Sequence, residues 1–184
     1  GCIFEIGLDR GASLSMWLEL FPNSFIYGMD IGAETTGERH QIFKADQSNI
    51  NDLNIIKGLL NNKEIFFIND DGSHVPEHQL LTFNTLFPIL KEGGVYIIED
   101  IETSYWTRGS MYGYNFNYGY KHPNSIIEIF KNIADSVNSE FLLDGCKCKV
   151  NHLDYISNIT FSQNCIIITK KKSIKKHYRM AGNL

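Results

Sequence analysis

The chain has 184 residues, of which 43% are hydrophobic and 21% charged, and its net charge at pH 7 is −4. This length and composition predict a globular domain with a substantial hydrophobic core. The acidic balance disfavours a nucleic-acid-binding protein, because such proteins usually present a basic surface. No apolar run approaches the ~18 residues of a membrane-spanning helix and no signal peptide is recognisable, so we expect a cytoplasmic protein that binds neither membranes nor nucleic acid.

The cysteines and the C-terminal lysines give no strong functional signal. Cys146 and Cys148 are two residues apart, but a zinc site needs about four ligands and no second pair lies nearby, so we expect reduced thiols. The lysines at 170–172 predict a solvated stretch, and residues 173–184 predict a C-terminal tail. The chain opens on an apolar run without an initiator Met, from which we expect further sequence upstream.

Short apolar runs alternate with segments of helical periodicity along the chain. Strands are predicted at 2–6, 24–29, 41–45, 65–68, 95–98, 155–161 and 164–169, and helices at 14–21, 52–60, 77–90 and 125–137. A tight turn at Ser162-Gln163 predicts an antiparallel hairpin of the last two strands. The pattern therefore predicts an α/β fold over residues 1–172, with a mainly parallel, Rossmann-like, seven-stranded sheet and a terminal antiparallel hairpin.

Two connecting segments lack such periodicity. Residues 32–39 are polar and predict a loop, whereas residues 101–120 alternate aromatic side chains with Gly and Asn. Long loops in compact domains are usually functional or disordered, and a high aromatic content disfavours disorder. We therefore expect the aromatic segment to be either a lid over a substrate or an oligomer contact.

Acidic side chains follow two of the predicted strands at the point where each strand ends. The run Asp70–His74 (DDGSH) follows the strand at 65–68, and Glu99-Asp100 follows the strand at 95–98. Ligands of open α/β sheets bind at the carboxyl ends of the strands. If these strands are neighbours, four carboxylates and one histidine converge there, and such a cluster needs a cation, a proton or a ligand to offset its charge.

A glycine-containing loop, Gly7–Ser13, joins the first strand to the first helix. Glycines allow a ligand to approach the backbone, and the helix start offers free N–H groups, but the GxxxG spacing is a weak signal beside GxGxxG. Glu5, inside the first strand, must be either solvated or hydrogen-bonded. Asp30 ends the second strand about 20 residues beyond the loop, a position that suits the ribose hydroxyls of an adenosine cofactor; a turn or cap role is the alternative.

Five blocks of sequence, taken in order, resemble the class I S-adenosylmethionine-dependent methyltransferases. They are Glu5-Ile-Gly7-x-x-x-Gly11-x-Ser13, Tyr27-Gly28-Met29-Asp30, Asp46-Gln47-Ser48, Asp70-Asp71-Gly72-Ser73-His74 and Gly93-Gly94-Val95-Tyr96-Ile97-Ile98-Glu99-Asp100. The resemblance covers nearly all of residues 2–170, and the terminal hairpin matches the antiparallel seventh strand of that fold. It implies that S-adenosylmethionine is the cofactor.

The resemblance also implies which residues contact the cofactor. Gly7 and Gly11 would admit its methionine part, and Glu5 and Ser13 would bind the polar end of that part. The remaining expected contacts are Asp30 with the ribose, Asp46 and Gln47 with the adenine, and Asp70 on the cofactor side or against the backbone.

The last two blocks are similar to the magnesium-dependent sugar O-methyltransferases of macrolide tailoring. That resemblance implies Mg²⁺ ligation by Asp71, Glu99 and Asp100, with His74 as the general base, and Ser104-Tyr105-Trp106 matches the same family. Each of these four residues has a structural alternative: a turn residue for Asp71, a cap or surface ion pair for Glu99 and Asp100, and a capping or packing role for His74. We expect His78, four residues beyond His74, at the surface.

The implied function is O-methylation of a sugar hydroxyl on a glycoside, antibiotic or polysaccharide, so the partner is a small-molecule or carbohydrate acceptor. The family carries an N-terminal region with no counterpart here, which leaves the acceptor and a homo-oligomeric state open. A catechol-type acceptor, an enzyme without a metal, a nicotinamide-dependent oxidoreductase and a non-catalytic methyltransferase-like module are the alternatives. The absence of GxGxxG and the terminal hairpin disfavour the oxidoreductase, and the intact acidic set disfavours the non-catalytic module.

Overall fold

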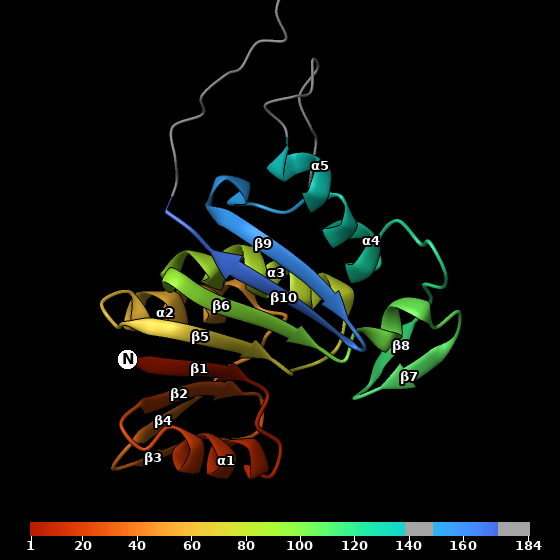
Figure 1. The fold of residues 1–184 in the computed structure, drawn as a ribbon. Helices are drawn as coiled ribbons and strands as arrows, with labels where there is room; N and C mark the ends of the chain where they lie inside the picture. The colour runs from red at the N-terminus through yellow and green to blue at the C-terminus, as the bar shows by residue number, and fades with distance from the viewer. Residues whose placement is uncertain (139–148, 173–184) are drawn as a thin grey trace, which may run out of the picture.

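The computed structural model describes residues 1–138 and 149–172. Its centre is an eight-stranded sheet with the order β3-β4-β2-β1-β5-β6-β10-β9 (Figure 1). The strands are β1 (Cys2–Ile6), β2 (Phe25–Asp30), β3 (Thr35–Gly37), β4 (His40–Lys44), β5 (Ile65–Asp70), β6 (Leu90–Glu99), β9 (Ile156–Ser162) and β10 (Cys165–Lys170). Strands β4, β2, β1, β5 and β6 run parallel, and β10 and β9 form the antiparallel end of the sheet. All seven expected strands are therefore present, and β3 is an eighth.

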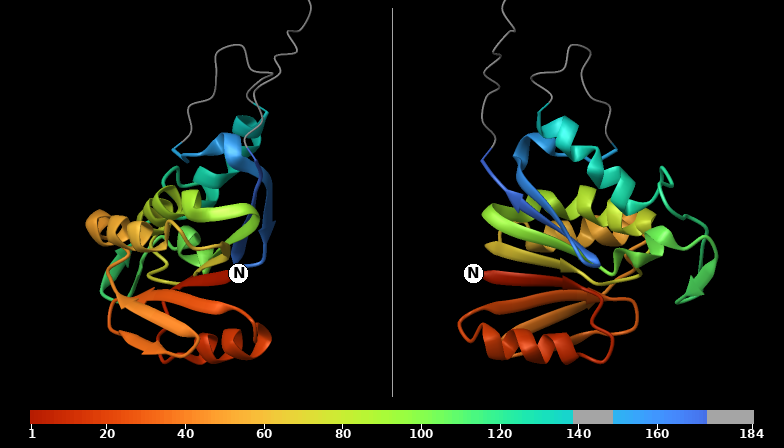
Figure 2. Two further views of the ribbon diagram at one scale, coloured as in Figure 1. Left: turned by 90° about the vertical axis from the view of Figure 1, so that its left-hand side faces the viewer. Right: turned by 45° about the vertical axis from the view of Figure 1, so that its right-hand side comes forward.

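Helices cover the two faces of this sheet unequally. The helical segments are α1 (Ala12–Leu20), α2 (Ile50–Leu60), α3 (Pro76–Leu86), η1 (Phe87–Ile89), η2 (Ile101–Tyr105), α4 (Ile126–Lys131), α5 (Ile133–Val137) and η4 (Leu153–Tyr155). Helix α1 lies on one face, and α2 and α3 lie on the opposite face together with α4 and α5 (Figures 1 and 2). A short hairpin of β7 (Gly109–Met111) and β8 (Tyr114–Phe116) stands beyond the carboxyl ends of the strands.

The alternation of side chains along each strand explains this layering. In β1, Phe4 and Ile6 are buried in the main core on the face of α2 and α3, while Glu5 points to the face of α1. On that second face, the ring of Trp17 in α1 packs against the ring of Phe67 in β5, with 5.3 Å between the ring centroids. The main core continues through buried residues of β6 and β10, which pair antiparallel.

Several predicted boundaries are wrong in detail. The expected loop at 32–39 contains β3, which pairs with β4, and the expected loop at 101–120 contains η2 and the β7–β8 hairpin. The expected helix at 77–90 ends at Leu86, where Pro88 cannot continue the hydrogen-bond ladder and η1 follows. Residues 125–137 form two helices, and the terminal turn lies at Gln163-Asn164, one residue later than expected. Residues 141–148, the tail at 173–184 and the thiols of Cys146 and Cys148 lie outside the described residues.

Lys170 corrects the expectation of a solvated lysine stretch. Its side chain is buried at the end of β10, and Nζ donates hydrogen bonds to the carbonyls of Phe87, Pro88 and Leu90, where η1 ends. The aliphatic part of a lysine can be buried while the ammonium finds oxygen acceptors, so a charged residue is compatible with this position.

None of the helices that the structure describes has the length and the apolar composition that a membrane-spanning helix requires.

Replacing Lys170 with Met is expected to lower the free energy of unfolding by about 1.5–3 kcal/mol, because three carbonyls, two of them in buried hydrogen bonds, lose a charged donor while the volume is kept. Urea unfolding of the variant beside Lys172→Met, at an exposed position two residues later, measures the difference. Equal midpoints for the two variants would contradict the buried role of Lys170.

Candidate active site

A cleft of about 780 Å³ lies at the carboxyl edge of the parallel strands. Its walls are the loops that follow β1, β2, β4, β5 and β6, together with two tyrosines of the β7–β8 hairpin. This is the edge at which the acidic runs were expected to converge, and its volume lies within the range of small-molecule and cofactor sites. The cleft is therefore the candidate active site.

The glycine loop after β1 packs directly against the turn that follows β5. Gly7 has φ +80°, and a Cβ at this position would lie 2.1 Å from the carbonyl oxygen of Asp71. The Asp71 N–H donates to the carbonyl of Ile6 over 3.0 Å, which fixes the two backbones side by side. Gly7 lines the cleft as expected, because only a residue without a side chain allows this approach. Gly11 caps α1 with φ +79° and does not line the cleft.

Glu5 is fully buried beneath the cleft rather than in its wall. Its carboxylate accepts hydrogen bonds from Ser13 Oγ (2.9 Å) and Trp17 Nε1 (3.0 Å). Burial raises the pKa of Glu5, and the hydrogen bonds from Trp17 and Ser13 oppose that shift. Of the two expectations for Glu5, solvated or hydrogen-bonded, the second is therefore confirmed. The carboxylate is bonded to side chains of α1, which it orients, instead of facing a ligand. Ser13 does reach the cleft.

Asp30 and Asp46 line the opposite part of the cleft. One oxygen of Asp30 accepts from the N–H groups of Gly32 and Ala33, and the other accepts from the Leu8 N–H at 2.9 Å. Asp30 thereby joins the loops after β1 and β2, and its second oxygen keeps a lone pair for a further donor. Asp46 accepts from the backbone N–H and the hydroxyl of Ser48 through one oxygen.

Gln47 connects the cleft wall to a buried carboxyl group. Its Nε2 donates to Asp70 Oδ1 over 2.6 Å, and its Oε1 accepts from the Ser73 N–H over 2.8 Å. Asp70, which was expected on the cofactor side or against the backbone, is fully buried and does not line the cleft. Burial raises the pKa of Asp70 to about 7, against the opposing hydrogen bond of Gln47. Gln47 and Asp70 therefore hold the turn that carries Asp71 and His74.

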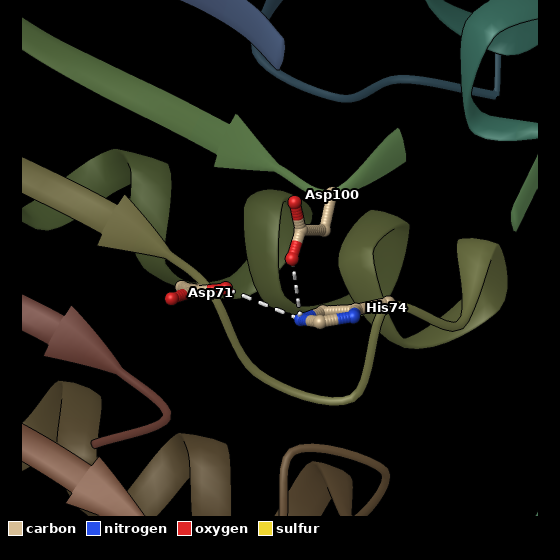
Figure 3. A group of neighbouring side chains, drawn as sticks. All are labelled: Asp71, His74 and Asp100. Carbon is tan, nitrogen blue, oxygen red and sulfur yellow. Dashed lines mark hydrogen bonds and ion pairs between the residues drawn. The ribbon is translucent and has the colours of Figure 1, made fainter. Parts of the chain in front are cut away.

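Asp71, His74 and Asp100 meet at the rim of the cleft (Figure 3). His74 Nε2 lies 3.2 Å from Asp71 Oδ1 and 3.6 Å from Asp100 Oδ2, and the potential ligand atoms of all three residues lie within 4.8 Å of one another. His74 is buried with φ +56°, and its carbonyl accepts from Thr103 Oγ1 over 2.7 Å. Its Nδ1 is buried without a hydrogen-bond partner among the described residues.

The protonation of this cluster is shifted by burial and by its own charges. Burial lowers the pKa of His74, but the hydrogen bond with Asp71 and the charges of Asp100, Asp71 and Glu102 outweigh burial and raise it. Burial raises the pKa of Asp100, and the negative charges of Glu102 and Asp71 add to that effect while His74 opposes it. The cluster thus favours positive charge at its centre, whether a proton or a cation.

Glu99 does not join this cluster in the structure. It is the last residue of β6, directly before Asp100, and it is outside the group whose potential ligand atoms lie within 4.8 Å of one another. Burial and the charges of Asp71 and Asp100 raise the pKa of Glu99, so its carboxylate is electrostatically linked to the cluster without lying in it. Of the three expected metal ligands, the structure therefore brings Asp71 and Asp100 together and leaves Glu99 outside the cluster.

Two aromatic side chains and a second histidine complete the site. Tyr112 and Tyr114 of the hairpin line the cleft, and the ring of Tyr112 lies edge-on to His74 with 5.7 Å between centroids. His78 was expected at the surface but is half-buried, with Nδ1 2.8 Å from Ser73 Oγ and its ring edge-on to Tyr114. Both tyrosines belong to the aromatic segment 101–120 that was expected to be a substrate lid or an oligomer contact, but neither was predicted as a site residue. The cleft-lining residues Arg10, Ile31 and Ala33 were also missed, although their places after β1 and β2 could have indicated them.

The chain has the fold of the class I S-adenosylmethionine-dependent methyltransferases. Within this class, the chain resembles the sugar O-methyltransferases of antibiotic pathways. It is 33% identical over 153 residues to L-olivosyl-oleandolide 3-O-methyltransferase from Streptomyces antibioticus, covering 78% of this chain and 38% of that protein. It is 37% identical over 112 residues to mycinamicin VI 2''-O-methyltransferase from Micromonospora griseorubida, covering 56% of this chain and 28% of that protein.

A solved structure confirms the fold similarity. The MycE methyltransferase of the mycinamycin biosynthetic pathway, in complex with Mg, SAH and mycinamycin VI, matches with a TM-score of 0.78 and 25% sequence identity, over 94% of this chain and 45% of that chain. No family model matches the chain. The chain thus spans less than half of the length of these relatives.

Proposed function

We propose that this chain is an S-adenosylmethionine-dependent O-methyltransferase that methylates a sugar hydroxyl with the help of Mg²⁺. The observation that carries the proposal is the position of the Asp71–His74–Asp100 cluster at the rim of a cofactor-sized cleft. The similarity to sugar O-methyltransferases supports it. We further propose a carbohydrate or other small-molecule acceptor, a cytoplasmic location, and one catalytic domain over residues 1–172.

The residues of the cluster fit Mg²⁺. Carboxylate oxygens are the ligands that Mg²⁺ prefers, and it usually takes only a few of them and keeps several waters. Asp71 and Asp100 offer such oxygens within 4.8 Å of each other, and Glu99 is the next carboxylate, with a pKa raised by burial and by their charges. A divalent cation would relieve this repulsion. We therefore propose Asp71 and Asp100 as ligands, and Glu99 as a third after reorientation of its side chain.

The remaining cleft fits S-adenosylmethionine. Gly7 and Ser13 would admit the methionine part, Asp30 would accept from a ribose hydroxyl through its second oxygen, and Asp46 would lie at the adenine. We assign Glu5, Gly11, Gln47 and Asp70 to the support of these loops, because their side chains or backbone conformations are engaged within the protein.

When bound, S-adenosylmethionine would supply an electrophilic methyl group and Mg²⁺ a Lewis acid that makes an alcohol more acidic. The protein must then place an acceptor hydroxyl in line with the methyl group and receive its proton. His74 is the proposed base, because its imidazole lies in the same cluster. Asp71 contacts the imidazole ring, and a hydrogen bond from Thr103 to the His74 carbonyl holds its backbone. The orienting contacts of Thr103 and Asp71 keep the ring at the cleft rim.

Calorimetric titration of S-adenosylmethionine and of NAD⁺ into the protein, with and without Mg²⁺, tests the proposal. We expect S-adenosylmethionine to bind and NAD⁺ not to bind. Methyl transfer to a panel of p-nitrophenyl glycosides, followed by mass spectrometry, should disappear with EDTA and return with added Mg²⁺. Binding of NAD⁺ alone would favour an oxidoreductase, and binding of neither would favour a non-catalytic module.

A further inference from the structure

The β7–β8 hairpin has a packed base and an exposed tip. At its base, Phe116 is 2% exposed and packs edge-on against the ring of Trp106, with 5.4 Å between centroids. Tyr118, just beyond the hairpin, donates a hydrogen bond from its hydroxyl to Glu77 of α3. Tyr112 at the tip is 71% exposed. The hairpin stands at the carboxyl edge of the sheet, beside η2 (Figure 1).

A chain of side-chain contacts fixes the hairpin against the catalytic turn. Ser73, between Asp71 and His74, contacts His78 Nδ1 through its hydroxyl at 2.8 Å. The His78 ring in turn meets Tyr114 edge-on at 4.9 Å between centroids. Because Tyr112 is the first residue of the two-residue turn and Tyr114 directly follows that turn, this contact sets the position of the tip over the cleft.

The turn carries a residue that the backbone alone does not favour. Tyr112 has φ +51° and Gly113 φ +83°, so both central residues of the turn are left-handed. Asn or Asp is usual at the first of these positions, and a bulky residue there is strained. Strained residues cluster at functional sites, and an exposed aromatic ring facing a buried histidine has no evident role in stability. The tyrosine is therefore better explained by a ligand than by folding.

We propose that Tyr112 is the aromatic platform on which the acceptor sugar ring lies, so that the hairpin is the acceptor-side wall of the cleft. This inference rests on the proposed function. The reacting hydroxyl must lie near His74, and Tyr112 contacts the His74 ring from the same cleft. A pyranose presents an apolar C–H face on which an aromatic ring packs, which leaves its hydroxyls directed towards the Asp71–His74–Asp100 cluster.

The test measures steady-state methylation of p-nitrophenyl α-L-rhamnopyranoside by the wild type, Tyr112→Asn, Tyr112→Phe and Tyr120→Asn. Tyr112→Asn removes the ring and keeps a residue suited to the left-handed turn, so it should fold at least as stably as the wild type. We expect its KM for the glycoside to rise about 10-fold, with an unchanged KM for S-adenosylmethionine. Tyr112→Phe should stay within about twofold of the wild type. Tyr120, 75% exposed and outside the cleft, is the matched control.

An unchanged KM for the glycoside in Tyr112→Asn would overturn the inference and leave the proposed function intact. An equal rise in the KM for S-adenosylmethionine would also overturn the inference, because Tyr112 would then affect the binding of both ligands and not specifically that of the sugar. A wild-type protein that binds S-adenosylmethionine and methylates no glycoside overturns the proposed acceptor class, and the inference with it.

Discussion

Replacing Asp71 with Asn is expected to lower methyl transfer by about 10³-fold or more while S-adenosylmethionine still binds. The substitution keeps the size and shape of the side chain but removes one of the two carboxylates that lie with His74 in the cluster. It therefore weakens the proposed Mg²⁺ site and the electrostatic support of the His74 imidazole together. The glycine loop, Asp30 and Asp46 are unchanged, so the cofactor part of the cleft should be preserved.

The melting temperature provides a readout of the metal that is independent of turnover. A ligand that binds only the folded state raises the melting temperature, so Mg²⁺ should stabilise the wild type and not Asp71→Asn. His74→Asn is the matched comparison, because it removes the proposed base and keeps both carboxylates; it should lose turnover and keep the response to Mg²⁺. If Asp71→Asn kept its turnover, the proposed metal site would be wrong.

Replacing Gly7 with Ala is expected to lower the free energy of unfolding by about 3 kcal/mol or more. A left-handed conformation costs a residue with a Cβ about 1–2 kcal/mol, and overpacking costs about 1–3 kcal/mol more. Here the new Cβ would lie 2.1 Å from the carbonyl oxygen of Asp71 and 2.7 Å from the Cα of Gly72, which are backbone atoms. The turn that carries Asp71 and His74 must move to make room.

Gly11→Ala separates these two contributions. Gly11 has almost the same φ as Gly7, but a Cβ there would meet nothing within 4 Å. Its replacement should therefore cost about 1–2 kcal/mol, from backbone conformation alone. Thermal unfolding gives the stabilities, and titration with S-adenosylhomocysteine shows whether the cofactor site survives. Equal destabilisation by the two substitutions would mean that the contact between Gly7 and the Asp71 turn is unimportant.

The sequence predicts the sheet well because its signals are local. The apolar runs within 2–6 and 164–169 mark strands β1 and β10 closely. Strands β3, β7 and β8 have only three residues each, and they form because a partner strand pairs with them rather than because of their own composition. A short strand of this kind leaves no periodic pattern to detect.

The site is predicted less completely, because a motif gives a residue's place in the chain and not the direction of its side chain. The acidic runs after β5 and β6 do converge, as expected for neighbouring parallel strands. Asp70 nevertheless points into the core towards Gln47 and Tyr96, and Glu99 is outside the group formed by Asp71, His74 and Asp100. The burial of Lys170 was missed for a related reason: its carbonyl partners at residues 87–90 are distant in the sequence.

The place of β1 in the sheet has a consequence for the order of folding. It joins β3-β4-β2 on one side to β5-β6-β10-β9 on the other, and its pairing with β5 connects residues 2–6 to residues 65–70. During synthesis, β1 can pair with β2 early, but its other edge stays open until β5 has emerged. An open edge of this hydrophobic strand can pair with other chains, so aggregation of nascent chains competes with folding during that interval.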